Sequence, residues 1–322
     1  MKRFSNILVA TDTRCDSHPI LDEAAKIAQE NEATLKIVDV VPHLQWTARL
    51  TLKKHEDVRK AVATDKQAKL NELAARLRDQ GINVESKVLW GKTSAEIVRE
   101  VLRSQHDLVM RVAKGHRSSR KGFFGATSRQ LLRDCPCAVW LATAAENPGY
   151  SHVLACIDTS TQHGRETELS NRVFNLASAV TEQQDAEMSV LHAWSMDAGG
   201  IPKSRISPIQ LQDMKESRRG HVEGLLDEFL KEHGTSIQAD NVHLIKDDPV
   251  LAIPAFTKEH GVDLVVIGTM ARSGLSGIVI GNTVEQILDD LECSVLAVKR
   301  GSFVSSIIHS ERENHTDKML SS

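Results

Sequence analysis

The chain has 322 residues, of which 41% are hydrophobic and 26% charged, a balance that excludes a disordered chain, a collagen-like fibre and a disulfide scaffold. At roughly 100–200 residues per domain, this length predicts two domains. Lysine and arginine number 40 against 43 acidic residues, so the net charge of −3 gives no reason to expect nucleic acid or a membrane surface as a partner.

In the first half of the chain, short β-branched runs alternate with amphipathic segments, a pattern typical of strand–helix–strand units that build a parallel sheet. We expect strands near residues 6–11, 34–40, 83–89, 107–112 and 137–141. Helices are expected at residues 18–31, 56–80 and 94–104, and a fourth helix is expected to begin at Thr127.

The second half repeats the same order. Strands are expected near residues 152–157, 187–193, 240–245, 263–267 and 294–298, and helices near 164–181, 208–233, 249–260 and 282–290. Asn6-Ile-Leu-Val-Ala-Thr-Asp12 returns as His152-Val-Leu-Ala-Cys-Ile-Asp158, an apolar strand that ends in an aspartate both times. Because such similarities recur in order along both halves, we infer a duplicated domain.

The duplication predicts an α/β protein with two tandem, doubly wound, five-stranded parallel-sheet domains. The strong turn formers in Asn147-Pro-Gly149 mark the junction. We therefore place the first domain at residues 1–147 and the second at residues 148–301. Residues 302–322 are expected to form a polar C-terminal tail.

Several classes of protein and site find no support in the sequence. No apolar run reaches the ~18 residues that a membrane-spanning helix needs, and Asp12 and Arg14 interrupt the first apolar stretch, so we expect a cytoplasmic protein without a signal peptide. No metal site is expected beyond Mg²⁺ carried by a nucleotide.

The five cysteines are expected to be reduced structural thiols, because they show neither a disulfide framework nor zinc-site spacing. Cys135-Pro-Cys137 does not have the spacing of a CxxC redox pair. Its place before an apolar strand predicts one buried thiol and one thiol in a turn.

Ligands of an open parallel sheet bind beyond the carboxyl ends of the strands, where the strand order reverses. Asp12 and Asp158 follow the first strand of each half. A carboxylate at this position either accepts a hydrogen bond from an adenine or ribose group or caps the next turn. Both aspartates are therefore candidate binding residues.

A glycine-rich loop follows the fourth strand of the second half and precedes a helix. Backbone N–H groups of glycines can approach phosphate oxygens closely, and a helix N-terminus adds free donors. Asn282 and Thr283, in the first turn of that helix, could add side-chain donors. The glycines of the loop are Gly268, Gly274, Gly277 and Gly281.

The duplicated plan, the aspartate after the first strand and this glycine loop resemble the universal stress protein family in its tandem-domain form, over about residues 4–300. The resemblance implies a Rossmann-like fold in each half. It is closest to the E-type tandem members of Gram-negative bacteria in the segments Lys121-Gly-Phe-Phe-Gly-Ala-Thr-Ser, Asp134-Cys-Pro-Cys137 and Gly281-Asn-Thr-Val-Glu.

Nucleotide-binding members of that family carry a G-x-x-G motif, nine further residues and then G-S/T. In the second half the matching positions are Gly268, Ala271 and Gly281, followed by Asn282 and Thr283, so one glycine is replaced and the hydroxyl is displaced by one residue. Ala271 is tolerated if its φ is negative and obstructive if its φ is positive. The resemblance implies an adenine nucleotide here, as ATP with Mg²⁺.

The first half departs further from the motif, with Val112, Gly115 and Gly125, followed by Ala126 and Thr127. The β-branched Val112 lies where a phosphate or ribose should touch bare backbone, so Asp12, Gly115, Gly125 and Thr127 are the weaker candidates. A basic loop either compensates by holding an anion or is simply solvated; it contains Lys114, His116, Arg117, Arg120 and Lys121.

These residues support two hypotheses. The first is a cytoplasmic universal stress protein that acts as a stress-response sensor or regulator and binds ATP in the second domain. The second is a nucleotide-independent tandem scaffold that binds partner proteins or an apolar small molecule, which the lost glycines favour. An enzyme ranks third, since no nucleophile with a base is evident; weak ATPase or phosphotransfer activity stays open.

Single-domain members of the family pair through their last strands. The resemblance therefore implies that the two halves form an intrachain pseudo-dimer, with Val139 and Val295 near its pseudo-two-fold axis. Because a tandem chain can satisfy this pairing internally, both a monomer and a homodimer are compatible with the sequence.

Overall fold

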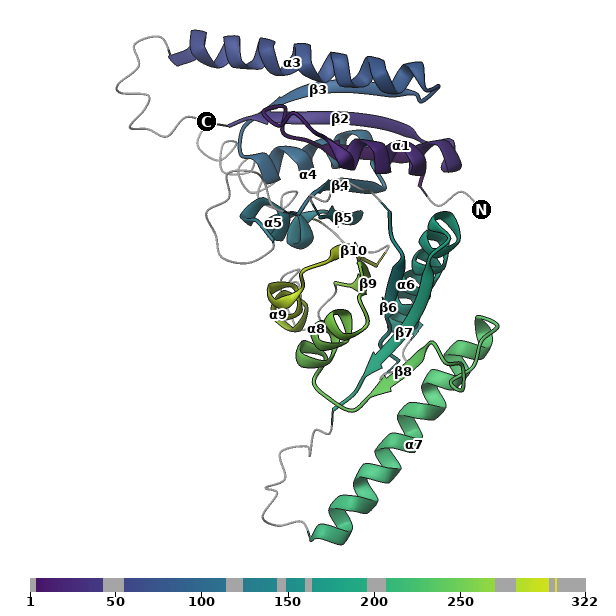
Figure 1. Cartoon of the computed structure of the whole chain (residues 1–322). Helices are drawn as coiled ribbons and strands as arrows, with labels where there is room; N and C mark the ends of the chain where they lie inside the picture. The colour runs from purple at the N-terminus through teal and green to yellow at the C-terminus, as the bar shows by residue number, and fades with distance from the viewer. Residues whose placement is uncertain are drawn as a thin grey trace. The chain divides into compact units, whose positions relative to one another are not determined.

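The computed structural model describes residues 4–42, 55–113, 124–143, 149–159, 164–195, 207–269, 282–300 and residue 305. These residues form two compact units (Figure 1). Unit 1 contains the described residues up to Gly149, together with Thr269, residues 294–300 and Ser305. Unit 2 contains residues 150–268 and 282–293, again within the described ranges.

Unit 1 is built on a sheet whose strand order is β3-β2-β1-β4-β5-β10. The strands are β1 (Asn6–Ala10), β2 (Thr34–Val41), β3 (Val84–Trp90), β4 (Leu108–Val112), β5 (Ala138–Ala142) and β10 (Ser294–Val298). The helices are α1 (Pro19–Asn31), α3 (His55–Asp79), α4 (Thr93–Ser104) and α5 (Ala126–Asp134). Strands β2 and β3 lie on one side of β1, and β4 and β5 lie on the other side, so the strand order reverses between β1 and β4.

The central strands of unit 1 are buried on both faces, as expected of a parallel sheet covered by helices on each side. Leu8 on β1 and Val109 on β4 are fully buried, and so are their neighbours along each strand. Helix α1 turns Ile20, Ala24 and Ile27 inward at helical spacing. Packing of these apolar faces fixes where the strands end, and therefore where a ligand could bind.

Strand β10 comes from the second half of the sequence but belongs to unit 1. It lies antiparallel to β5, with Leu296 opposite Trp140 at the centre of the paired segment. Val295 faces Leu141, while Val139 faces Ala297. Val139 and Val295 thus lie on either side of the central pair, and both are fully buried.

Unit 2 has four parallel strands in the order β9-β6-β7-β8. They are β6 (His152–Cys156), β7 (Glu187–Ala193), β8 (Val242–Ile245) and β9 (Leu264–Gly268). The helices are α6 (Gly164–Gln184), α7 (Pro208–Glu232), α8 (Pro249–Glu259) and α9 (Asn282–Asp290). Figure 1 shows α7 as a long, regular helix.

Local sequence explains where α7 begins. The Ser207 hydroxyl oxygen accepts a hydrogen bond from the backbone N–H of Gln210, the Ser207 N–H donates to the Gln210 side-chain oxygen, and Pro208 fills the first helical position. Val222, Leu226 and the residues near them form the buried face of the helix.

The predicted α/β class with mostly parallel strands is confirmed, and the helices and strands lie close to their predicted bounds. From the second half of the sequence, unit 1 takes in Thr269 and β10 within the described ranges. Ser305 is the one described residue of the predicted tail, and it is fully buried. None of the helices within the described ranges is long and apolar enough to cross a bilayer.

Candidate functional site

In unit 1, the carboxylate of Asp12 is held by the loop that follows β1. The guanidinium of Arg14 donates two hydrogen bonds to this carboxylate, from Nε to Oδ1 at 2.7 Å and from NH2 to Oδ2 at 2.5 Å. The backbone N–H of Arg14 adds a third bond of 3.1 Å. This bonding with Arg14 lowers the pKa of Asp12 to about 2 against the opposing effect of burial. Asp12 is therefore an ionised group whose oxygens already have partners.

A second carboxylate, Asp39, fills the neighbouring carboxyl end of β2. Its Oδ2 accepts hydrogen bonds from the backbone N–H of Thr13 at 2.9 Å and from the Thr13 hydroxyl at 2.7 Å. Lys66 of α3 forms an ion pair with the same oxygen, and Lys69 donates to the Thr13 carbonyl at 3.1 Å. Both Asp39 and Lys66 are buried, so side chains of unit 1 occupy this space themselves.

Arg111 of β4 adds a further cation. Its Nε donates to the carbonyl of Val112 at 3.2 Å. Burial lowers the pKa of Arg111, whereas the nearby charges of Asp12 and Asp39 raise it, which places the guanidinium in the same charged network. The Val112 side chain was expected to disfavour a nucleotide at the end of β4. The guanidinium of Arg111, bonded to the Val112 carbonyl, disfavours it further.

The other first-half candidates lie at the start of α5. Gly125 precedes the helix with φ −74° and ψ 165°, a conformation open to any residue, and its N–H donates to the Ala113 carbonyl at 3.0 Å. Thr127 is half-buried in the first turn. Gly115 and the basic loop around it lie outside the described residues. A phosphate role for Gly125 and Thr127 remains a prediction.

In unit 2, the equivalent position after β6 is more open. Asp158 is exposed, and its backbone carbonyl accepts a hydrogen bond of 2.8 Å from Ser170 of α6. The hydroxyl oxygen of Thr159 is buried, yet no group in the described ranges bonds to it. Thr159 follows Asp158 as Thr13 follows Asp12, so the same hydroxyl is satisfied in unit 1 and unsatisfied in unit 2.

His192 of β7 occupies the position that Asp39 occupies in unit 1. Asn6 is aligned with Thr34 and His152 with Glu187, so Asp39 and His192 lie equally far along their strands. The buried ring bonds through Nδ1 to the carbonyl of Ile157 at 2.9 Å, which assigns the proton to Nδ1. Burial lowers the pKa of His192, so the ring is neutral near pH 7.

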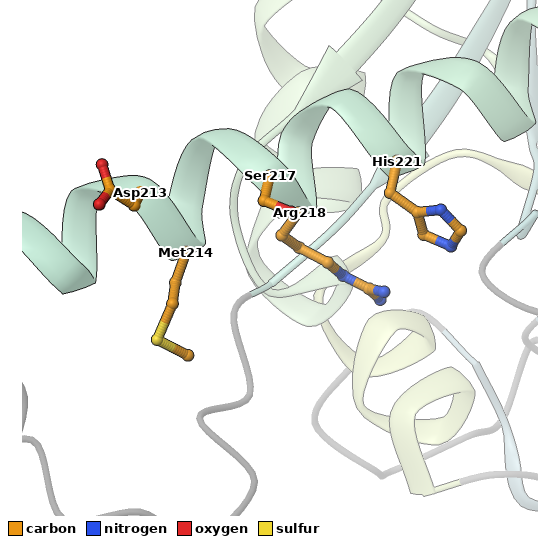
Figure 2. A pocket seen from close by; sticks show the side chains of 5 residues that line it. All are labelled: Asp213, Met214, Ser217, Arg218 and His221. Carbon is orange, nitrogen blue, oxygen red and sulfur yellow. The ribbon is translucent and has the colours of Figure 1, made fainter.

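Asp158 and Arg218 both influence His192, the aspartate raising its pKa and the arginine lowering it. Arg218 of α7 is therefore near enough to His192 for its charge to act on the ring. An open pocket of about 550 Å³ lies along this helix. Figure 2 shows Met214, Arg218 and His221 projecting from the same side of α7; the pocket is lined by Asp213, Met214, Ser217, Arg218 and His221.

The glycine-loop candidates of the second half are only partly described. Gly268 ends β9, and a Cβ on it would lie 2.7 Å from Cδ2 of Leu169 on α6. Packing against α6 therefore accounts for this glycine without a ligand. Asn282 begins α9 and Thr283 is exposed in its first turn, as expected. Ala271 and Gly281 lie outside the described residues.

Sequence reasoning missed Asp39, Lys66, Arg111, Thr159, His192 and Arg218. Asp39 could have been recognised as a candidate from the sequence, because it is an acidic residue inside the apolar run Ile37-Val-Asp-Val-Val. Arg218 carried no such signal, because its charge acts on His192 only in the folded chain. Among the described residues, no group of three or more His, Cys, Asp or Glu is placed to hold a metal ion.

Two sets of parallel strands in the same order, each with an aspartate after its first strand, define a tandem, doubly wound α/β protein. The chain belongs to the universal stress protein family, whose model matches residues 3–143 and 149–299.

Curated relatives agree with this assignment. Universal stress protein E of Photorhabdus laumondii is 27% identical over 311 residues, covering 94% of this chain and 97% of that protein. Universal stress protein E of Escherichia coli K12 is 26% identical over 325 residues, covering 98% of this chain and 100% of that protein. The predicted resemblance to tandem, E-type members is thereby confirmed.

Solved structures show the same fold. A functionally unknown protein from Pseudomonas aeruginosa PAO1 superposes with a TM-score of 0.73 at 23% identity, covering 98% of each chain. A universal stress protein from Archaeoglobus fulgidus superposes with a TM-score of 0.63 at 18% identity, covering 92% of this chain and 97% of that one.

Proposed function

We propose that this protein is a stress-response sensor or regulator that binds an adenine nucleotide, ATP with Mg²⁺, in unit 2 and not in unit 1. Membership of the universal stress protein family supports a stress-response role. The proposal adds the ligand and the unit that holds it. It assigns the protein a binding role rather than a catalytic one.

The observation that carries this proposal is the contrast between the two threonine hydroxyls. Thr13 donates to Asp39, which is also paired with Lys66, so unit 1 satisfies its own polar groups. The buried hydroxyl of Thr159 has no partner in the described part of the chain, and neutral His192 replaces the aspartate beside it. An unsatisfied buried hydroxyl costs about 1–3 kcal/mol, so a ligand that bonds to it is favoured.

Several side chains of unit 2 fit the chemistry of a nucleotide. The exposed Asp158 carboxylate would accept a hydrogen bond from a ribose hydroxyl or from the adenine amino group. The Arg218 guanidinium, next to His221 in the pocket on α7, would attract phosphate oxygens. The N-terminus of α9, beginning at Asn282, would add backbone donors for a phosphate. ATP carries the Mg²⁺, so no protein metal site is required.

Calorimetric titration of nucleotide-stripped protein with ATP and Mg²⁺ tests the proposal. We expect about one equivalent to bind. Arg218→Gln should weaken binding roughly tenfold or more, because a charge-assisted hydrogen bond contributes about 1.5–3 kcal/mol. Thr159→Val, which keeps the shape but removes the hydroxyl, should also weaken it.

Arg219→Gln is the matched control. Arg219 is the next residue on α7, but it is exposed and bonds to Glu223 at 2.7 Å on the helix surface. Its replacement should leave the affinity for ATP unchanged. Equal losses for Arg218→Gln and Arg219→Gln, or no binding up to millimolar ATP, would overturn the proposal. The absence of binding would instead favour the nucleotide-independent scaffold.

A further inference from the structure

Two cysteines of unit 1 lie in contact at the connection between α5 and β5. The Sγ atoms of Cys135 and Cys137 are 3.4 Å apart, close enough for a hydrogen bond between the thiols. Cys135 is fully buried at the C-terminal end of α5, and Cys137 is half-buried just before β5. The sequence expectation of one buried thiol and one turn thiol is correct, but spacing alone did not show that the sulfurs meet.

A buried lysine accompanies this pair. Lys299 follows β10, is almost completely buried and donates from Nζ to the carbonyl of Arg133 at 2.9 Å. Burial lowers the pKa of Lys299 to about 8, against the opposing effects of Cys135, Asp134 and Cys137. Its amine is therefore mostly protonated at pH 7, next to two thiols that it can stabilise in the ionised form.

The electrostatic balance at the pair favours one thiolate. Burial opposes ionisation of Cys135, but the hydrogen bonds from Cys137 and the charge of Lys299 outweigh it and lower the pKa of Cys135. The bond to Cys135 raises the pKa of Cys137, so the second proton is retained. The acidic groups that oppose this are Asp134, which acts on Cys135, and Asp107, which acts on Cys137.

The thiols of Cys156 and Cys293 have no such environment. Burial raises the pKa of Cys293 to about 12 and raises that of Cys156 further still. Neither has a cation among the groups that shift its pKa. These two cysteines provide internal references of low reactivity within the same chain.

We propose that Cys135 and Cys137 are a peroxide-reactive dithiol that closes to an intramolecular disulfide. The geometry supplies two sulfurs in contact, a stabilising ammonium and, at Cys137, an edge that solvent reaches. The proposal is independent of nucleotide binding, since every group it uses lies in unit 1.

The chemistry balances with hydrogen peroxide as the oxidant. The pair first loses one proton to solvent and shares the other along the hydrogen bond between the sulfurs. Ionisation is favoured at Cys135, but the shared proton can move along the bond to Cys135, which leaves the thiolate on the less buried Cys137. The Cys137 thiolate then attacks one peroxide oxygen; the O–O bond breaks, a sulfenic acid forms on Cys137, and the hydroxide released takes up a proton to leave as water. The Cys135 sulfur then attacks the Cys137 sulfur, the S–S bond forms, and a second water leaves. Two thiols and one peroxide thus give one disulfide and two waters.

Treatment of the full chain with stoichiometric hydrogen peroxide, followed by alkylation under denaturing conditions and peptide mass mapping, tests the proposal. The peptide that carries both cysteines should lose the mass of two hydrogen atoms and resist alkylation. A thiol reductant should restore it, because a ring that spans one intervening residue is strained. Cys156 and Cys293 should stay alkylatable. Their oxidation at the same rate, or a failure of the pair to cross-link, would overturn the proposal.

Variants of Cys135 and Lys299 distinguish their roles in the oxidation from a purely structural role. Cys135→Ser should stop the reaction at a sulfenic acid on Cys137 that a cyclic diketone traps. Lys299→Met should slow oxidation roughly tenfold at pH 7 if it raises the thiol pKa by one unit, and should shift the pH profile of the rate upward. Lys299→Arg keeps the charge and should retain the rate. Identical pH profiles for Lys299→Met and the parent chain would contradict the assigned role of the lysine.

Discussion

The carboxylate of Asp39 and the ammonium of Lys66 form a buried ion pair in unit 1, with exposed fractions of 6% and 8%. At the same position along β7 of unit 2 stands His192, which is neutral near pH 7 and bonds to a backbone carbonyl. Two halves that share one strand plan therefore differ in charge at the point where a ligand would bind. The proposal that unit 2 and not unit 1 binds the nucleotide rests on this difference.

Removing one partner of this pair should be costly. Lys66→Met leaves the Asp39 carboxylate buried without its cation, which destabilises a protein by about 3–5 kcal/mol. We expect urea unfolding of unit 1 to shift accordingly to lower denaturant concentration. The double variant Asp39→Asn with Lys66→Met removes both charges and should recover most of the loss. Equal stabilities of the single and double variants would contradict a paired, buried charge.

Gly268 offers a test of packing at the end of β9. In Gly268→Ala the new methyl group would lie 2.7 Å from Cδ2 of Leu169, so the leucine must move. We expect a loss of about 1–3 kcal/mol in the free energy of unfolding, typical of overpacking.

Gly220→Ala is the matched control for that substitution. Gly220 is exposed within α7, and nothing lies within 4 Å of its added Cβ. It should stabilise the helix by about 1 kcal/mol. Combining Gly268→Ala with Leu169→Ala should make the added methyl group harmless; an undiminished penalty would show that packing against α6 is not the reason for the glycine.

Much of the fold could be predicted from the sequence, because strand and helix periodicities are local properties. The positions of Asp12 and Asp158 follow from the same local patterns, since each lies two residues after the end of an apolar strand; their role in binding stays a prediction. What decides the site is not local. Lys66 meets Asp39 across a strand-to-helix connection, and the charge of Arg218 acts on His192 only in the folded chain. Likewise, periodicity predicts β10 as a strand but not the unit it joins.

Glu23 should make stability depend on pH. Burial raises the pKa of this carboxyl group from 4.5 to about 7, with Lys26 opposing and Glu30 adding to the shift. Because the folded chain disfavours the ionised form, stability should fall as the pH rises from about 4.5 through 7. A shift of this size corresponds to roughly 3 kcal/mol. Glu23→Gln should be more stable than the parent chain at pH 8 and similar to it at pH 5. Parallel pH curves of unfolding for the two chains would refute this.

The titration of His106 should lower stability at low pH, whereas that of Glu23 lowers it at high pH. It is buried after α4, and neither ring nitrogen has a hydrogen-bond partner in the described part of the chain. Burial, followed by the charge of Lys36, lowers its pKa below 6.5. The unfolded chain therefore binds the proton more readily, and stability is lost as the pH falls through 6.5.

His106→Leu removes both the unsatisfied nitrogens and the titrating group. The variant should unfold at a higher denaturant concentration than the parent chain, with the larger gain at pH 5 and the smaller at pH 8. The measurement is the unfolding midpoint at each pH. A gain of the same size at both values would mean that protonation of His106 does not contribute.

The most direct test of the central claim is amide hydrogen exchange of the intact chain with and without ATP and Mg²⁺. If unit 2 alone binds the nucleotide, exchange should slow in peptides that cover Asp158 to Thr159 and the segment of α7 around Arg218. Peptides around Thr13, Asp39 and Lys66 should be unchanged. Slower exchange at the unit 1 peptides, or none at either place under saturating ATP, would contradict the account.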